Sequence, residues 1–249
     1  MSEELPHNIV FTRSGLSTSL CAICMVLVLA TSGIAYAPST AQLCELIGAR
    51  NLAAGRTEAL SFLVSLRLGD SQDVAAEGRL DSDPSGLSRL DLVGVDGRRR
   101  QLNLQGRLYG SRNGVFSQTA RPLLPPLYYL QVNSFEKLAA LLDLPVDFPT
   151  AVSFSQLGDK DCFVLSSSRE GGLALLVEID SLEIVGIRLN NDTLFELGPL
   201  KQFGRVKIPS WIRVNRKDGF RATLLVTDLI EKAVPATNYS NEWLREVGN

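Results

Sequence analysis

Residues 60–81, LSFLVSLRLGDSQDVAAEGRLD, decide the class of fold. Apolar side chains occupy every second position from Leu60 to Leu68, and the alternation returns from Val74 to Leu80. The residues between the two runs, Gly69-Asp70-Ser71, are typical of a turn. A period of two predicts an antiparallel hairpin with one buried face and one face in solvent.

Similar runs continue along the chain, separated by turn signals at 83–86 and at Asp96-Gly97 and interrupted by prolines at 122–126. The further strands are expected near 90–92, 102–108, 150–154, 162–165, 173–179, 184–189, 211–214 and 220–226. About ten or eleven antiparallel strands around two helices predict a mainly β (α+β) fold, in which a curved sheet forms a half-open β-barrel. No break in composition divides residues 38–249, so we expect a single domain there.

Two segments carry helical signals. Ser39 and Gln42 form a capping-box pattern before an apolar stripe, which predicts a helix over 40–54. A second stripe, with Leu138 and Leu142 in it, predicts a short helix within 133–142. This second helix either plugs the core or acts as a mobile lid, and the sequence leaves both alternatives open.

Residues 20–37, LCAICMVLVLATSGIAYA, carry no charge and end in Ala35-Tyr36-Ala37. That ending is the small-x-small pattern which signal peptidase reads. The alternative is an uncleaved anchor, but the run is short for a span of about 20 residues. We therefore expect residues 1–37 to be a signal peptide cleaved after Ala37, and the mature protein to be periplasmic.

The composition excludes most classes of enzyme mechanism that depend on histidine. His7 is the only histidine, and 25 basic and 27 acidic residues give a net charge of −2. Without residues 1–37 no histidine remains, which excludes histidine general bases, Ser-His-Asp or Cys-His systems and histidine-bound metals. No phosphate-binding glycine loop and no G-x-S-x-G motif occurs. We expect no catalysis, no metal and no cofactor, and the charge balance disfavours nucleic acid as a partner.

Cys44 and Cys162 are the cysteines that remain after residue 37. In an oxidising compartment two cysteines favour one disulfide, so we predict a bridge between them. The alternative is a pair of buried free thiols.

The inward-facing positions of the predicted sheet and of the second helix are aliphatic. Such a wall suits a lipid tail, because each buried methylene contributes about 0.8 kcal/mol without any hydrogen bond. The predicted lipid-binding residues are Leu60, Val64, Leu66, Leu90, Leu92, Leu102, Leu104, Leu138, Leu142, Leu175 and Val177.

Arg98, Arg99 and Arg100 follow directly on the Asp96-Gly97 turn. Three arginines at a hairpin tip either keep a sheet edge soluble or contact anionic headgroups or an acidic partner. We include them as candidate partner or membrane contacts.

The order of the elements over 40–235 resembles the LolA/LolB family of periplasmic lipoprotein carriers and lipoprotein-sorting proteins. The segments that carry the resemblance are 63–68, 76–80, 89–97 and 203–214. The resemblance implies an unclosed barrel, a helical lid and a hydrophobic cavity for the acyl chains of lipoproteins. In the LolB branch an exposed apolar residue lies in the loop after the third strand, and Val95 falls in the corresponding loop. The LolB lipidation cysteine is missing, so the resemblance is to the soluble branch or to a divergent relative.

Together these observations predict a monomeric periplasmic protein that binds lipids or lipoprotein acyl chains and exchanges them with a membrane donor or acceptor protein. The alternative is a periplasmic sensor or regulatory module of the same fold, which binds a protein.

Overall fold

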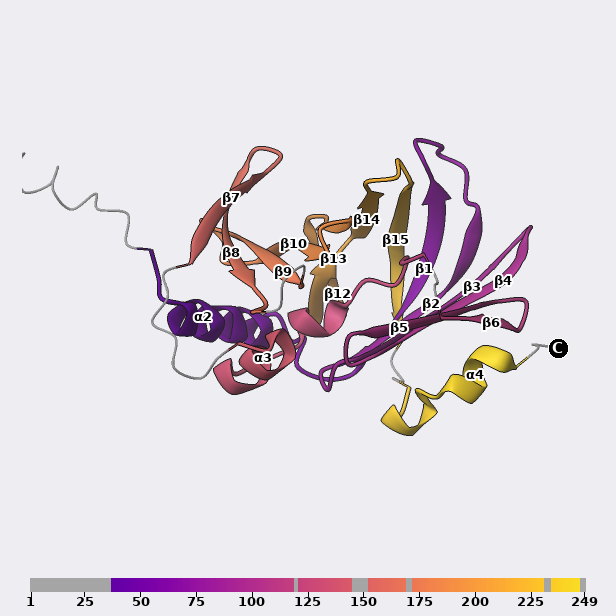
Figure 1. The fold of residues 1–249 in the computed structure, drawn as a ribbon, viewed down its shortest axis with the longest axis horizontal. Coiled ribbons are helices and arrows are strands. Elements are labelled where there is room, and N and C mark those ends of the chain that lie inside the picture. The colour runs from indigo at the N-terminus through magenta and orange to yellow at the C-terminus, as the bar shows by residue number, and fades with distance from the viewer. Residues whose placement is uncertain (1–36, 119–120, 145–151, 169–171, 231–233, 247–249) are drawn as a thin grey trace, which may run out of the picture. The chain divides into compact units, whose positions relative to one another are not determined.

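The alternating sequence folds into one large antiparallel sheet in the computed structural model, which describes residues 37–118, 121–144, 152–168, 172–230 and 234–246 (Figure 1). Thirteen strands follow the order β6-β5-β4-β3-β2-β1-β15-β14-β11-β10-β9-β8-β7, and β12 and β13 form a separate hairpin. The first half comprises β1 (Leu60–Leu68), β2 (Ala76–Asp83), β3 (Leu87–Gly94), β4 (Gly97–Leu104), β5 (Arg107–Arg112) and β6 (Val115–Ser117). The second half comprises β7 (Ser153–Leu157), β8 (Lys160–Ser166), β9 (Ala174–Glu178), β10 (Ile184–Leu189), β11 (Thr193–Leu197), β12 (Leu200–Phe203), β13 (Val206–Pro209), β14 (Trp211–Arg216) and β15 (Arg221–Ile230).

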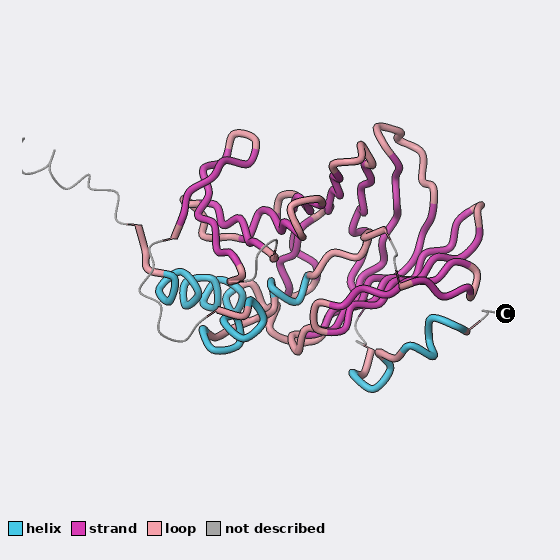
Figure 2. Tube along the Cα trace, viewed as in Figure 1, coloured by secondary structure: helices cyan, strands magenta, loops and turns pink. Residues whose placement is uncertain are grey.

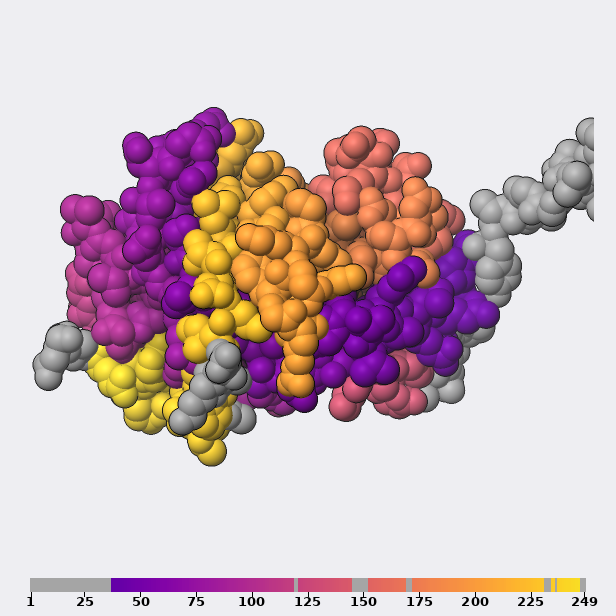
Figure 3. All heavy atoms as spheres, turned by 180° about the vertical axis from the view of Figure 1, so that it is seen from behind, coloured from indigo at the N-terminus to yellow at the C-terminus, as the bar shows by residue number. Residues whose placement is uncertain are grey.

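The two halves of the sheet meet where β1 pairs with β15. Their register runs from Ser61 opposite Ile230 to Leu68 opposite Ala222. Figure 3 shows this junction from behind, with β15 in yellow between the purple of the first strands and the orange of β14. The outermost strands, β6 and β7, do not pair with each other, so the sheet is open. The predicted fold class, an open curved antiparallel sheet with helices, is confirmed.

The described helices flank the sheet (Figure 2). They are α2 (Thr40–Ala53), α3 (Phe135–Leu142) and α4 (Asn241–Arg245), with short 3-10 turns η1 (Leu127–Leu130) and η2 (Ala236–Asn238). The predicted capping box is present at α2: Gln42 N donates to Ser39 Oγ at 3.3 Å, and Ser39 N donates to Gln42 Oε1 at 2.9 Å. Among the described residues, no helix is long and apolar enough to cross a membrane.

Several short elements were not predicted as separate units. A turn at Gln105-Gly106 divides the expected 102–108 run into β4 and β5, with both residues at positive φ. The turn η1 and the helix α4 are too short to show a clear hydrophobic period. Their positions depend on contacts with distant strands, which a local pattern does not reveal.

The sheet has two faces with different partners. We call the face that packs against α2 and α3 the inner face, and the opposite one the outer face. Apolar residues of the inner face form the main core with side chains from α2, α3 and the segment 121–132. A second cluster lies on the outer face, where Leu102 packs with Tyr239 and Leu244 of the C-terminal segment 234–246.

Arginines of the outer face hold the C-terminal segment. The Arg100 guanidinium donates to the carbonyl oxygens of Trp243 at 2.5 Å and Glu246 at 2.7 Å. Two guanidiniums lie close to the Trp243 ring, with Arg89 at 4.9 Å and Arg100 at 5.1 Å from its centroid. These contacts satisfy carbonyls at the end of α4 and place positive charge where the helix dipole favours it.

Asp81 is the buried centre of the charges on the outer face. Its carboxylate accepts from Arg79 Nε at 2.6 Å and Arg89 Nε at 2.7 Å, and from the hydroxyl of Ser61 at 2.5 Å. The Asp81 side chain is only 2% exposed. Burial of a charge is costly unless it is paired and hydrogen-bonded, so this arrangement depends on all three partners.

The predicted disulfide between Cys44 and Cys162 is absent, because both are free buried cysteines. Cys44 lies in the main core on the inner face, whereas Cys162 packs with Leu176 and Val185 in a separate cluster. The two thiols therefore belong to different layers of the structure, and each is surrounded by apolar side chains.

We predict that replacing Asp81 with alanine destabilises the fold strongly, because two arginines lose their shared carboxylate. The expected loss in free energy of unfolding is about 3 kcal/mol, measured by urea denaturation. Asp96→Ala is the control, since Asp96 is 68% exposed and its ion pairs contribute at most about 1 kcal/mol. Equal losses in the two variants would contradict the central role of Asp81.

We further predict two free thiols per chain lacking residues 1–37, when the protein is unfolded without reductant and titrated with a thiol reagent. Burial, together with nearby Glu45, raises the pKa of the Cys44 thiol to about 12, so the folded protein should react very slowly. A count of zero after unfolding would restore the disulfide.

Candidate functional site

Most predicted lipid-binding residues come together on the inner face. They are buried in the same apolar cluster and come from β1, β3, β9 and α3: Leu60, Val64, Leu66, Leu90, Leu92, Leu138, Leu142, Leu175 and Val177. The strands therefore build a continuous aliphatic wall, as the alternation of the sequence indicates. That these residues bind lipid stays a prediction.

Leu102 and Leu104 are the exception, and their predicted inward orientation is wrong. In the register of β3 with β4, Leu90 lies opposite Gln101 and Leu92 opposite Arg99. The polar residues of β4 thus share the face of the buried leucines. Leu102 and Leu104 lie on the outer face beneath the C-terminal segment, which supplies the apolar cover that they need.

The inner face is not empty. Segment 121–132, between β6 and α3, lies against it and contributes buried side chains, among them Leu124, Tyr128 and Leu130. We call this segment the plug. Only four of its residues form a helical turn, η1, so most of its backbone polar groups need partners from elsewhere.

Three side-chain amides anchor the plug, and two of them bind its backbone groups. Gln101 of β4 accepts from the backbone N–H groups of Leu123 and Leu124, each at 2.8 Å, and donates to the carbonyl of Arg121 at 2.5 Å. Asn51 of α2 donates to the carbonyls of Tyr129 at 3.1 Å and Val132 at 2.6 Å.

The third amide belongs to the plug itself. Gln131 accepts from the Ser82 hydroxyl at 2.6 Å and donates to the carbonyls of Glu58 at 2.7 Å and Ser82 at 3.2 Å. Gln131 is 2% exposed, so these bonds are shielded from water and costly to lose.

A buried arginine fixes the orientation of Asn51. Arg56 Nη2 donates to Asn51 Oδ1 at 2.9 Å and pairs with Glu183 Oε2 at 2.7 Å. The Arg56 side chain is 1% exposed. Because the amide oxygen accepts from Arg56, its nitrogen is directed to the plug carbonyls, and α2, the plug and the β9–β10 turn are held together.

A cavity of about 890 Å³ lies at the mouth of the inner face. The apolar part of its wall is formed by Leu108, Leu124, Tyr128, Leu141 and Leu173, which come from β5, the plug, α3 and the position just before β9. The rest of the lining is mainly polar and includes the amides of Asn103 and Gln105 and the charged side chains of Arg107, Asp143, Asp192 and Arg216. The volume falls within the range of about 300–1,000 Å³ usual for small-molecule sites.

Helix α3, for which the sequence leaves a core or a lid role open, borders this cavity. Its C-terminal end is held by the Tyr129 hydroxyl, which donates to the carbonyl of Leu141 at 3.2 Å, and by a bond from Ser168 to the carbonyl of Asp143. Leu138 and Leu142 are 0% and 1% exposed, so they belong to the core. Leu141 is half-buried and faces the mouth.

The predicted contact residues Val95, Arg98, Arg99 and Arg100 do not form one surface. Val95 is fully exposed at the β3–β4 turn. Arg98 forms a bidentate pair with Asp91 on the outer face, at 2.7 and 2.6 Å. Arg100 is 4% exposed and engaged with α4, so it is a structural residue and not a free contact. Arg99 lies on the inner-face side of β4 and pairs with Asp96 at 3.3 Å.

The two tyrosines of η1 are held in their neutral form. Burial raises the pKa of the Tyr128 hydroxyl to about 12, and burial raises the pKa of neighbouring Tyr129 well above its ordinary value. Neither tyrosine therefore serves as a base at neutral pH. Within the described part of the chain, no group of three or more His, Cys, Asp or Glu residues could hold a metal ion.

The residues that line the mouth were missed by sequence reasoning, apart from their general apolar character. Leu141 was seen only as part of a helical stripe, and Tyr128 lies in the proline-rich stretch that carries no period. The sequence does carry a signal for the position of Gln101. Neighbouring residues of a strand lie on opposite faces, so Gln101 and Leu102 cannot both face the same side.

Comparison with known proteins agrees with this architecture. No family model matches the sequence, and no curated protein matches it. Among solved structures, LolA superfamily protein NE2245 from Nitrosomonas europaea aligns over 84% of this chain and 100% of that chain, at 13% identity and a TM-score of 0.50. An outer membrane lipoprotein-sorting protein domain from Vibrio parahaemolyticus aligns over 82% and 98%, at 10% identity and a TM-score of 0.42. The Pseudomonas aeruginosa MucA/MucB complex aligns over 81% and 60%, at 14% identity and a TM-score of 0.29. The first of these matches shows that the chain shares the fold of that LolA superfamily protein, as the resemblance in the sequence implied.

Proposed function

We propose that this protein is a periplasmic, non-catalytic carrier that binds the acyl chain of a lipid or lipoprotein. The observation that carries the proposal is the cavity of about 890 Å³ at the mouth of an aliphatic sheet face. An acyl chain gains affinity from buried area alone, and five buried methylenes would contribute about 4 kcal/mol.

The first contact of such a chain would be with Leu108, Leu141 and Leu173 at the mouth. Deeper entry would require displacement of plug side chains such as Tyr128 and Leu124, since they occupy the inner face. The hydrogen bonds of Gln101, Asn51 and Gln131, which we call the amide clamps, set the free-energy cost of that displacement. The mouth is therefore the part of the site that is open to a ligand while the clamps remain intact.

The second candidate function is that of a periplasmic regulatory module which binds a protein. The filled inner face favours it, because the predicted aliphatic wall is already covered by the plug. Mass spectrometry of lipids extracted from the purified periplasmic protein distinguishes the two functions. Bound acyl lipids at near stoichiometric amounts support the carrier, and lipid-free protein in a stable protein complex supports the module.

We predict that Leu141→Glu lowers the affinity for a fluorescent fatty-acid probe at least tenfold. The carboxylate would lie in the apolar wall of the mouth, where it repels the probe's headgroup and removes apolar contact area. The half-buried position lets the new charge reach water, so the thermal midpoint should fall only slightly.

Leu52→Glu is the matched control, because Leu52 lies on α2 and is 62% exposed. It should leave probe affinity unchanged. Leu138→Glu should unfold the protein, since a carboxylate at a fully buried position costs several kcal/mol against a total stability of about 5–15 kcal/mol. Wild-type protein that binds no probe, or a Leu141→Glu variant that binds as wild type does, would contradict the carrier function.

We also predict export and cleavage after Ala37. The intact mass of the protein recovered from a periplasmic fraction should correspond to a chain that begins at Pro38. Recovery of a full-length chain in the membrane fraction would instead show an uncleaved anchor. Residues 1–36 lie outside the described part of the structure, so this prediction rests on the sequence.

A further inference from the structure

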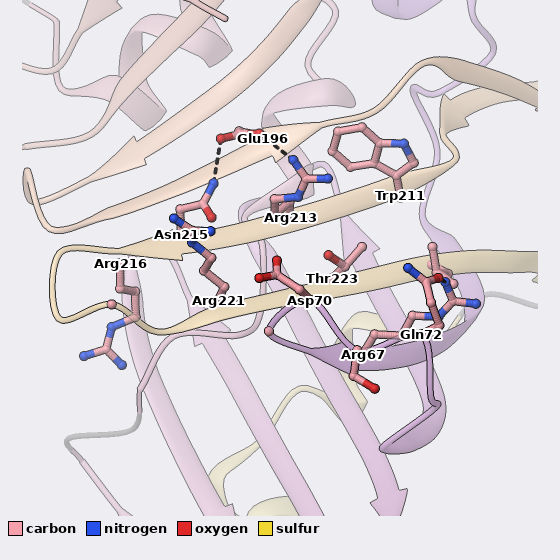
Figure 4. A pocket seen from close by; sticks show the side chains of 14 residues that line it. Arg67, Asp70, Gln72, Glu196, Trp211, Arg213, Asn215, Arg216, Arg221 and Thr223 are labelled. Carbon is pink, nitrogen blue, oxygen red and sulfur yellow. Dashed lines mark hydrogen bonds and ion pairs between the residues drawn. The ribbon is translucent and has the colours of Figure 1, made fainter.

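A groove of about 980 Å³ crosses the outer face of the sheet at the junction of β1, β15, β14 and β11 (Figure 4). It lies on the face opposite the aliphatic wall and shares one lining residue, Arg216, with the mouth cavity. Its walls include four arginines, Arg67, Arg213, Arg216 and Arg221, and two acids. The groove is therefore basic although the whole chain carries a net charge of −2.

The strand register gathers three of these arginines around one threonine. Thr223 of β15 lies opposite Arg67 of β1 on one side and opposite Arg213 of β14 on the other. Arg221 lies two residues before Thr223 on the same strand, and hence on the same face. Neighbouring strands are about 4.8 Å apart, so long side chains from all three strands can reach a group placed over Thr223.

Arg213 is held in place by its neighbours. Its Nη1 pairs with Glu196 Oε2 at 3.5 Å, and its guanidinium lies 4.9 Å from the centroid of the Trp211 ring. Trp211 packs flat over Gly198, where a Cβ atom would come within 2.5 Å of the ring. Glu196 also accepts from the Asn215 amide at 2.6 Å. Such fixed positions reduce the entropy that a ligand must overcome on binding.

Arg67 and Arg221 have no carboxylate partner among the described residues. Arg67 Nη1 donates to Gln72 Oε1 at 2.7 Å, and this neutral acceptor orients the guanidinium without cancelling its charge. Arg67 Nε is buried and has no hydrogen-bond partner in the described part of the chain. Buried donors without partners are rare in native structures, and an acceptor bound in the groove would supply the missing bond.

The arrangement selects among anions. A carboxylate has two oxygens in one plane, which a single guanidinium saturates through parallel hydrogen bonds. Donors that approach from three strands suit an anion with oxygens directed to several sides, as in a phosphate group. The volume of the groove exceeds that of one phosphate, so it has room for the group to which the phosphate is attached.

We propose that this groove binds a phosphate group, either in a soluble phosphate compound or in the headgroup of an anionic lipid. Arg67 and Arg221 provide the uncompensated charge, and Arg213 provides the fixed donor. The proposal does not depend on the acyl-chain function, because the groove and the apolar wall lie on opposite faces of the sheet.

The test compares two double variants of equal charge. Arg67→Gln with Arg221→Gln removes the two uncompensated arginines of the groove. Arg50→Gln with Arg205→Gln is the control, because both side chains are exposed and neither lines the groove. Thermal midpoints of all three proteins verify that each is folded.

Soluble phosphate is tested by calorimetry with inorganic phosphate and glycerol 3-phosphate. Lipid headgroups are tested by co-sedimentation with phosphatidylcholine vesicles, with and without phosphatidylglycerol. We expect wild type and the control to bind at least one probe, with affinity that falls as salt rises, and the groove variant to bind it at least tenfold more weakly.

Each outcome decides the proposal. Binding to a soluble phosphate that only the groove variant loses supports the proposal with a soluble source. Binding confined to phosphatidylglycerol vesicles, and lost only in the groove variant, supports it with a lipid source. Absence of binding to all probes, or equal loss in the groove and control variants, overturns it. A glutamate-rich peptide that binds wild type when neither phosphate probe does would also overturn it, and would indicate a protein ligand.

Discussion

An irregular segment lies inside an apolar concavity, and its backbone polar groups must find partners there. This constraint on residues 121–132 organises the interior. A helix satisfies most of its N–H and carbonyl groups internally and a strand satisfies them through its neighbours, but the plug contains only one 3-10 turn. Gln101 and Asn51 therefore serve as replacement partners, and Gln131 of the plug binds Glu58 and Ser82; all three amides are buried. Their donors and acceptors define where the plug lies, which apolar contacts alone would not do.

The constraint spreads outward from these amides. Gln101 can reach the plug only if β4 directs its polar residues inward, and this moves Leu102 and Leu104 to the outer face. There they require an apolar cover, which Tyr239 and Leu244 of the C-terminal segment supply. Asn51 in turn depends on Arg56, whose charge depends on Glu183. One irregular segment thus accounts for a polar inward strand, an outer apolar cluster and a buried ion pair.

The sequence predicts the parts of this structure that are local and periodic. The hairpin of Leu60 to Leu80, the capping box of Ser39 and the helix that contains Leu138 all follow from residue spacing, and all are present. The predicted face of β4 is wrong because apolar character alone places Leu102 and Leu104 inward. The buried amide of Gln101 needs hydrogen-bond partners, and those partners lie on the inner face. The arginines at 98–100 looked like one exposed cluster, yet alternation places Arg99 on one face and its neighbours on the other. The partners that decide each case, Asp91 and Trp243, lie far along the chain or on another strand, so no local pattern identifies them.

The two faces of the sheet differ in the kind of side chain that they carry. The buried part of the inner face is mainly aliphatic, with amides such as Gln101 among its polar groups, whereas the outer face of the same strands carries a row of arginines. Over β2 to β4 each of these arginines has an acid or a backbone carbonyl as partner: Arg79 and Arg89 share Asp81, Arg98 pairs with Asp91, and Arg100 binds the end of α4. Across the junction at β1 and β15 that compensation stops. Arg67 has a neutral amide as its acceptor, and Arg221 has no carboxylate partner among the described residues. Uncompensated like charges destabilise a folded surface, and the same sheet neutralises them a few strands away. The contrast within one face therefore distinguishes arginines that hold the protein together from arginines that remain available to an anion.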